Sequence, residues 1–505
     1  MFVDINLFTM ESLPINFQSA TEIAAGIKQG TYTSEEVVKL HLEQIKKYNE
    51  QINAVVILFE KEAIERAIEA DAALARGENW GELHGVPITL KEAFKTKGVK
   101  TTLNSKVLKD YVAEEDAVVV KRLKGEGAII LGKTNIPEML SDVQSFGPIY
   151  GQCNNPYALD HTPGGSSGGS GASVSAGFAA FDIGSDIGGS VRVPAHNCGL
   201  YSIKPTENTM VQKGHVPLLP GAKGNVLHMS NIGPITRSVN DLEMVFKIIN
   251  GPDHKDITVP PIDYLDYGNK ELGSYRIAWN NQFIHITADA ETSTLMRQLG
   301  DKLSQQGALV KKAFPDQLDY SKILYNWGLL FGMIVGQDLP WPIRLLTKLN
   351  FRKFTGIMGK GLRRGLNLDF KEYAQALKLR EEVCISYQQF FKEFDVLLTP
   401  VALTPAVTHR KTGSLVEIDG VKHTYFESLA STTSIFNFSG HPAVIVPLGQ
   451  SSAGLPIGLQ IVGPYWSDLE LIKFARKIDF LVQGYKPPRG FVRTRRVPKS
   501  QKVTT

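Results

Sequence analysis

The chain alternates between stretches with helical spacing of apolar residues and short apolar runs that predict buried strands. Residues 19–76 have the helical pattern, and Thr33 followed by Glu36 predicts a capping box at the start of one helix. A helix beginning near Asp116 leads into the apolar run 128–132, which predicts a strand. Helix and strand in repeated succession are typical of an α/β fold.

A second group of apolar runs predicts further strands. The run 86–90 stands directly before Lys91, so we expect a strand that ends at this lysine. Three more runs in the last third of the chain begin at Asp395, Ala443 and Leu455. Between these groups, residues 264–394 are expected to be helical, after a Pro- and Asp-rich loop at 253–263. No unit repeats at a fixed period, which argues against a solenoid.

The segment 164–190 has an unusual composition, because sixteen of its twenty-seven residues are glycine or serine. A flexible linker of this composition would stay polar throughout. This segment instead contains Val174, Phe178 and Ile183, which favour burial. We therefore expect its part 172–184 to form a helix that runs into a buried strand.

Composition permits a large core and gives no sign of a nucleic-acid partner. The 505 residues are 43% hydrophobic, which is typical of globular proteins. The 55 basic and 51 acidic residues nearly cancel, to a net charge of +4, so we expect no nucleic-acid binding. Basic residues gather at 486–505, which we expect to be a flexible, solvated tail.

Cysteine usage and hydropathy predict a cytoplasmic protein. Cys153, Cys198 and Cys384 are far apart and lack CxxC spacing, which argues against a disulfide framework and a zinc site. Residues 1–17 have no basic segment before an apolar run, unlike a signal peptide. The best candidate for a membrane span, 327–335, is too short to cross a bilayer. We expect no integral membrane segment.

One glycine pattern offers a nucleotide-binding interpretation. GAIILGKT, residues 127–134, fits the GxxxxGK[ST] motif of a phosphate-binding loop. Its four middle residues are apolar and themselves predict a strand. Pro137 follows three residues after the threonine, which suits a short turn better than a phosphate-binding helix.

A second pattern offers a nucleophile elbow. GGSSG, residues 164–168, fits the GxSxG motif of α/β-hydrolases with Ser166 as the nucleophile. That motif needs an apolar strand directly before it, whereas the preceding residues are NPYALDHTP. Histidines that could complete such a triad are present downstream, at His409, His423 and His441.

A third interpretation takes three segments together: GVPITLKEAF around Lys91, TPGGSSGGS around Ser166, and GSDIGGSVRVPAHNCGLYSIKPT around Ser190. They closely resemble the amidase signature family, which includes bacterial amidases and fatty-acid amide hydrolases. GKTNIPEM, DVLLTP and FNFSGHPAVIVPLGQSSAGLPIGLQIVGP also resemble family blocks, in the family's order, so the resemblance covers most of the chain. It implies a single α/β/α sandwich around a large, mixed, twisted sheet.

The resemblance implies an amidase with a Ser, cis-Ser, Lys triad made of Lys91, Ser166 and Ser190. Neutral Lys91 takes a proton from Ser166, which takes one from the nucleophile Ser190, and an acyl-enzyme forms. The cis peptide bond implied by the family is Gly165–Ser166. An ordinary lysine has a pKa of about 10.4, so a base at Lys91 requires burial. No metal or cofactor is implied.

The residues around the triad suggest supporting roles. The backbone N–H groups of Ile187, Gly188 and Gly189 are candidates for the oxyanion hole, because glycine lets consecutive amides converge on one point. Hydrogen bonds from Ser167, Asp186 and Arg192 could orient the triad. Leu140 aligns with a substrate-facing position of fatty-acid amide hydrolases, and it fits core packing or pocket lining equally well.

The sequence suggests one division of the chain. We expect an N-terminal helical segment (1–80), a core with the catalytic residues (81–252), a variable helical pocket region (253–394), the C-terminal part of the core sheet (395–485) and the basic tail (486–505). Aromatic residues at 325–341 could line the pocket of an acyl amide with apolar bulk, although such residues more often belong to a core.

The branch of the family is less well defined. The catalytic subunit of glutamyl-tRNA amidotransferase carries SRYG…ASSLDQIGP after KPT, whereas this chain continues with ENTMVQKGHVPLLPGAKGNVLHMSNIGP from Glu207. A stand-alone hydrolase of a small-molecule amide, releasing a carboxylate and ammonia or an amine, is therefore preferred over an amidotransferase subunit. Esterase or acyltransferase activity with the same triad is an alternative, and a homodimer is possible because dimers are common in the family.

Overall fold

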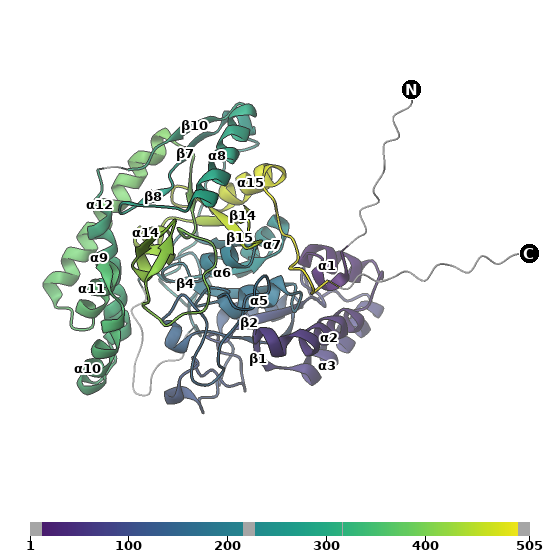
Figure 1. The fold of residues 1–505 in the computed structure, drawn as a ribbon. Coiled ribbons are helices and arrows are strands. Elements are labelled where there is room, and N and C mark those ends of the chain that lie inside the picture. Colours follow the sequence, from purple (N-terminus) through teal and green to yellow (C-terminus); the bar gives the residue numbers. More distant parts are fainter. Residues whose placement is uncertain (1–12, 216–227, 316, 493–505) are drawn as a thin grey trace, which may run out of the picture.

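One mixed β-sheet runs through the molecule and carries helices on both faces (Figure 1). The computed structural model describes residues 13–215, 228–315 and 317–492. Within these residues, eleven strands form the sheet and two two-stranded ribbons lie apart from it. Residues 1–12 of the N-terminal segment, residues 216–227 of the stretch after Glu207, and the tail from residue 493 onward lie outside the described part.

The sheet combines parallel and antiparallel neighbours. Its strands follow the order β1 (Val55–Leu58), β3 (Ile129–Thr134), β2 (Pro87–Lys91), β4 (Phe181–Asp186), β6 (Asn231–Thr236), β5 (Tyr201–Lys204), β14 (Ala443–Gln450), β15 (Pro456–Val462), β11 (Val396–Pro400), β7 (Arg276–Trp279) and β10 (Leu309–Lys312). Strand β2 is parallel to β3 and β4, β7 is parallel to β10 and β11, and the other pairs are antiparallel. The ribbons pair β8 (Gln282–Phe283) with β9 (Ile286–Thr287) and β12 (Val416–Ile418) with β13 (Val421–His423).

The helices form layers over the sheet. One layer contains α1 (Ala20–Lys28), α4 (Val118–Gly125), α7 (Val239–Ile249), α8 (Ala290–Gln305) and α15 (Asp468–Ile478). The opposite layer contains α2 (Ser34–Ile52), α3 (Glu60–Ala75), α5 (Gly168–Ser175) and α6 (Arg192–Asn197). Among the described helices, none is long and apolar enough to cross a membrane.

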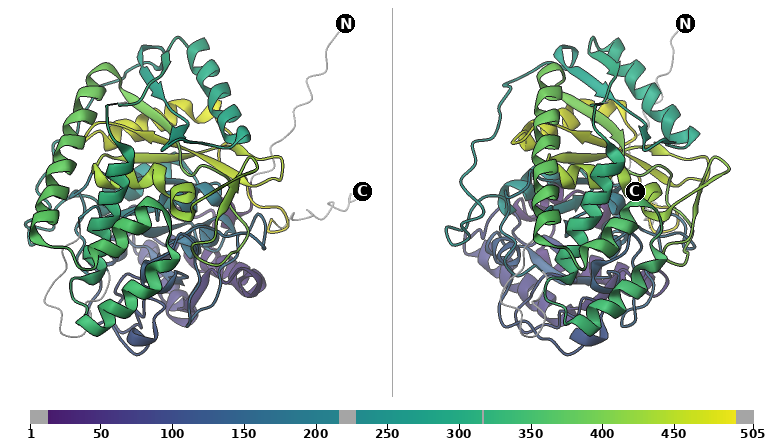
Figure 2. Two further views of the ribbon diagram at one scale, coloured as in Figure 1. Left: turned by 60° about the vertical axis from the view of Figure 1, so that its left-hand side comes forward. Right: turned by 90° about the vertical axis from the view of Figure 1, so that its left-hand side faces the viewer.

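A further group of helices lies beside the sheet, and Figures 1 and 2 show its green members gathered on one side of the molecule. It comprises α9 (Tyr320–Gly336), α10 (Trp341–Asn350), α11 (Gly356–Gly365), α12 (Phe370–Glu393), α13 (Tyr425–Leu429) and α14 (Ser431–Phe438). The short 3-10 helices are η1 (Ile15–Phe17), η2 (Lys106–Leu108), η3 (Glu138–Leu140), η4 (Leu272–Ser274), η5 (Phe351–Lys353) and η6 (Asp479–Leu481).

Strand β2 shows how the sequence sets the two faces of the sheet. Alternate residues of a strand point to opposite faces. Ile88 and Leu90 belong to the large core shared with α4 and α7. Thr89 and Lys91 share the other face, where the hydroxyl oxygen of Thr89 lies 3.1 Å from that of Ser173 on α5. The catalytic candidate Lys91 therefore points into the layer where α5 begins.

The structure confirms the α/β fold and the strands predicted for the middle of the sheet. Strands β2, β3, β4, β11, β14 and β15 form at the predicted apolar runs. The capping box is present, because the Thr33 side chain accepts from the Glu36 amide and the Glu36 carboxylate accepts from the Thr33 amide.

Two of the helical predictions are wrong in part. Within 19–76, strand β1 separates α2 from α3 and forms an edge of the sheet. Within 264–394, β7 and β10 contribute two strands to the opposite edge. Each of these three strands is four residues long. Runs this short carry too few residues for their periodicity to distinguish a strand from a helix.

Candidate active site

Lys91 lies at the end of β2, and its side chain is completely buried. Its Nζ lies 2.7 Å from Oγ of Ser166, 2.9 Å from Oγ of Ser185 and 3.2 Å from the carbonyl oxygen of Ser185. A carbonyl oxygen can only accept hydrogen bonds, so the Lys91 amine donates to Ser185. In the neutral amine, two N–H groups directed at Ser185 leave the lone pair free to face Ser166.

The surroundings of Lys91 favour its neutral form. Burial lowers the pKa of Lys91 to about 7, although the carboxylates of Asp186 and Asp182 act in the opposite direction. Glu92, the next residue, turns away and accepts hydrogen bonds from Thr102. The lysine is therefore poised to accept a proton near neutral pH.

Ser166 lies in the turn directly before α5, and the peptide bond Gly165–Ser166 is cis, as the family resemblance implied. The amide of Ser167 donates a hydrogen bond to the carbonyl oxygen of Ser190 at 3.2 Å. This bond joins the turn that carries Ser166 to the turn that carries Ser190. The structure thus brings all three expected triad residues into one region.

The turn 187–190 leaves β4 and is held by the carboxylate of Asp186. The amide of Gly189 donates to Oδ1 at 2.8 Å, and the amide of Val191 donates to Oδ2 at 3.1 Å. Gly189 has a φ of +115°, a conformation that L side chains rarely adopt. Within the described part of the chain, the amides of Ile187 and Gly188 donate no hydrogen bond.

Asp186 is held in turn by Arg192, and both side chains are completely buried. The guanidinium donates through Nε to Oδ2 at 3.0 Å and through Nη2 to Oδ1 at 2.9 Å. Burial alone would raise the pKa of Asp186, but the charge of Arg192 together with the hydrogen bonds from Arg192, Asn437 and the backbone holds that pKa below its usual value. This pair fixes the base of the turn that precedes Ser190.

Several residues of this site were missed by the sequence reasoning. Ser185 orients the amine of Lys91, and Thr433 and Asn437 from α14 hold the turn, donating to the carbonyl oxygen of Gly188 and the carboxylate of Asp186. The position of Ser185 directly before Asp186 is a signal that could have found it. The residues of α14 lie far along the chain and have no local signal.

Three other residues considered from the sequence pack within the protein interior or against a hydrophobic cluster. Leu140 is half-buried and packs against a small cluster with Leu103 and Ile136. His196 is buried and accepts a hydrogen bond from the amide of Gly458, and burial lowers its pKa to about 4. Cys198 is fully buried, as expected for a small core residue.

Both competing glycine patterns lack the local structure they require. Residues 129–134 of the candidate phosphate loop form β3 inside the sheet. Residues 155–163, before Ser166, form no strand, only isolated bridges between Asn155 and Ala158 and between His161 and Thr408. A nucleophile elbow needs a strand there.

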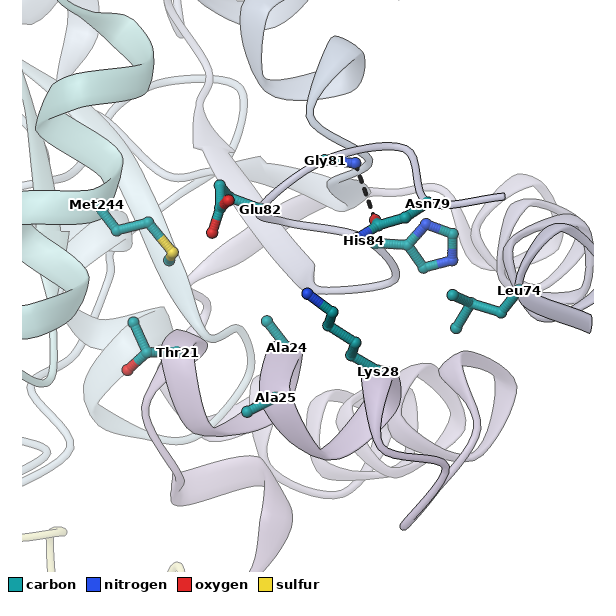
Figure 3. A pocket seen from close by; sticks show the side chains of 10 residues that line it. All are labelled: Thr21, Ala24, Ala25, Lys28, Leu74, Asn79, Gly81, Glu82, His84 and Met244. Atoms are coloured by element: carbon teal, nitrogen blue, oxygen red, sulfur yellow. Dashed lines mark hydrogen bonds between the residues drawn. The ribbon is translucent and has the colours of Figure 1, made fainter. Parts of the chain in front are cut away.

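A cavity of about 250 Å³ lies away from the triad residues, and Figure 3 shows the side chains that line it. It is lined by Thr21, Ala24, Ala25, Lys28, Leu74, Asn79, Gly81, Glu82, His84 and Met244. None of the triad residues takes part, so this cavity gives no argument about the chemistry. Within the described ranges, no three His, Cys, Asp or Glu side chains gather as a metal-binding set.

A family model described as amidase matches residues 36–472. The chain belongs to the amidase family. Its position in this family makes it an amide-cleaving enzyme, and the confirmed α/β fold with a large mixed sheet is the fold of solved amidase structures.

Individual members of the amidase family show how wide the similarity is. A glutamyl-tRNA(Gln) amidotransferase subunit of Acinetobacter baumannii (strain AYE) is 31% identical over 482 residues, which cover 91% of this chain and 95% of that protein. A solved structure described as an amidase has a TM-score of 0.77 and 25% identity, covering 92% of this chain and all of the other. A fatty acid amide hydrolase shares the fold, with a TM-score of 0.77, 24% identity, and coverage of 94% and 86%.

Proposed function

We propose that this amidase hydrolyses an acyl amide through Lys91, Ser166 and Ser190, by way of an acyl-enzyme. The observation that carries the proposal is the buried contact of 2.7 Å between the amine of Lys91 and the hydroxyl of Ser166. A lysine with a pKa near 7 can act as a general base at neutral pH, which an exposed lysine cannot do.

The reaction uses each group in turn. Neutral Lys91 accepts the proton of Ser166, and Ser166 accepts the proton of Ser190, whose Oγ attacks the amide carbonyl carbon. The C–N bond then breaks, and the proton returns along the same path to the leaving nitrogen. Water next attacks the acyl ester on Ser190 and releases the carboxylate.

The turn 187–190 supplies donors for the oxyanion. Of the three amides expected from the sequence, those of Ile187 and Gly188 donate no hydrogen bond to any described residue, whereas Gly189 already donates to Asp186. We therefore assign oxyanion stabilisation to Ile187 and Gly188, with Gly189 shaping the turn. Removal of one such donor typically costs about 10²–10³ in rate.

The test is a panel of amides and esters of varied acyl length, assayed on the wild type, Ser190→Ala, Lys91→Ala and, as a control, the exposed Ser452→Ala. We expect turnover to be lost in the first two variants and kept in the control. A fluorophosphonate should label Ser190. Undiminished turnover in Ser190→Ala, or labelling of Ser166, would overturn this mechanism. Faster turnover of the esters would favour the esterase or acyltransferase alternative.

A second candidate is a glutaminase subunit of an amidotransferase, favoured by the name of the curated relative that is 31% identical to this chain. The sequence after Lys204 argues against this candidate, because the stretch typical of the amidotransferase branch is replaced there by a different sequence. The same panel, with glutamine added, separates the candidates. A stand-alone hydrolase turns over simple acyl amides without another protein, whereas an amidotransferase component needs its partners.

A further inference from the structure

Trp327 on α9 contacts the turn that carries Ser190. It is 3% exposed, and its indole Nε1 donates a hydrogen bond of 2.8 Å to the carbonyl oxygen of Ile187. Its ring also lies against Gly188, where an added Cβ would come within 2.5 Å of the ring. The turn therefore has the indole as a wall on this side.

The geometry of the peptide unit makes this hydrogen bond relevant to catalysis. In a planar trans peptide, the C=O of one residue and the N–H of the next point in opposite directions. The Ile187–Gly188 bond is trans, since the only cis bond described is Gly165–Ser166. A carbonyl of Ile187 tied to Trp327 consequently aims the N–H of Gly188 away from α9.

The neighbouring peptide unit is held at both ends without Trp327. The carbonyl oxygen of Gly188 accepts from Oγ1 of Thr433 at 2.8 Å, and the amide of Gly189 donates to Asp186. The Ile187 carbonyl has no other donor among the described residues. The orientation of the Gly188 amide therefore depends on Trp327 more than on any other side chain described.

Close packing of helix α9 against α11 fixes the position of the Trp327 indole. Two glycines, Gly328 and Gly332, let α9 approach α11 so closely that an added Cβ would lie 2.3 Å and 2.2 Å from backbone oxygens of α11. Phe331 lies beside Trp327, with 5.3 Å between the ring centroids. A rigid support of this kind is what a positioning group needs.

We propose that Trp327 is a positioning residue that aims the Gly188 amide at the oxygen of the reacting carbonyl. The proposal rests on the function proposed above, and among the aromatic residues at 325–341 it assigns a role in orienting the oxyanion site to Trp327 alone. A misdirected donor weakens stabilisation of the transition state more than binding of the substrate. Loss of this positioning is therefore expected to lower kcat and to leave KM nearly unchanged.

The experiment compares Trp327→Phe with Trp341→Phe, a matched control at a tryptophan that is 75% exposed. We expect Trp327→Phe to lower kcat roughly tenfold to hundredfold at nearly unchanged KM. The inhibition constant of an acyl boronate or aldehyde, which mimics the tetrahedral state, should rise by the same factor. The control should match the wild type in all three quantities.

A second variant separates the lost hydrogen bond from lost packing. Benzothienylalanine at position 327 keeps the bicyclic ring and lacks the N–H, so it should fold as the wild type does and show the same fall in kcat. Wild-type kcat in this variant, or a change in KM alone, overturns the proposal. If Ser190→Ala retains turnover, the proposed function fails instead; if only the Trp327 variants behave as the wild type, this inference fails alone.

Discussion

The amine nitrogen of Lys91 lies 2.7 Å from the hydroxyl oxygen of Ser166, and both side chains are buried. No carboxylate forms an ion pair with this amine among the described residues. A base without a hydrogen-bonded counter-ion loses its proton more readily than a lysine in a salt bridge. The proposed role of Lys91 as a base depends on the absence of such a counter-ion.

Replacement of the base should abolish activity whatever the charge of the new side chain. Lys91→Ala removes the proton acceptor, and Lys91→Arg supplies a guanidinium that stays protonated. We expect kcat to fall by about 10²–10⁴ in both variants. Steady-state kinetics measures this, with the exposed Lys97→Ala as control. Substantial activity in Lys91→Arg would contradict proton transfer to this side chain.

The pH profile should report the titration of Lys91. The pKa of this lysine is lowered to about 7 by burial, so the amine is protonated below pH 7 and cannot accept a proton. We expect kcat/KM to rise with pH through a midpoint near 7 and to level off above it. The profile should be measured between pH 5 and 9 with an amide that does not titrate in this range. A flat profile would argue against lysine as the base.

Replacement of Asp182 should shift the midpoint of the kcat/KM pH profile. Asp182 pairs with Thr89, which shares a strand face with Lys91, and one of its carboxylate oxygens is buried without a hydrogen-bond partner. Its negative charge favours the protonated lysine. Asp182→Asn should therefore lower the midpoint of the kcat/KM profile.

The control for this shift is Asp110→Asn, at a carboxylate that is 74% exposed, and its profile should not move. The direction of the shift is the decisive result. An unchanged or raised midpoint in Asp182→Asn would show that the carboxylate does not act on Lys91, whereas a general loss of activity at all pH values would indicate a disturbed fold.

The sequence was sufficient for the parts of the site that are encoded locally. Lys91 follows an apolar run, and a glycine-rich turn surrounds Ser190, so both the strand and the turn could be predicted from neighbouring residues. The cis bond at Ser166 followed from the family resemblance and is present. These features depend on short stretches whose residue types have few alternatives.

The remaining features depend on contacts between distant segments, and no local pattern records them. Trp327 meets Ile187 across 140 positions of sequence, and Thr433 meets Gly188 across 245. Spacing could show that residues 325–341 are aromatic but not which ring would carry a hydrogen bond to the turn. The edge strands were missed for a related reason, since four residues gain strand character mainly from the neighbour they pair with.

The buried pair of Asp186 and Arg192 gives a prediction about stability. Arg192→Met leaves the carboxylate of Asp186 buried without its counter-charge, which typically costs about 3–5 kcal/mol. The turn 187–190 should also loosen, because Asp186 holds the amide of Gly189. We therefore expect a large loss in the free energy of unfolding together with loss of activity.

The matched control for that variant is Arg476→Met, which breaks a pair with Glu243 on the surface, where the arginine is 42% exposed. Exposed pairs contribute only about 0–1 kcal/mol, so urea unfolding should place this control near the wild type. Equal destabilisation by the two variants would contradict a special role for the buried pair. A stable but inactive Arg192→Met protein would show instead that the pair orients the turn without holding the fold together.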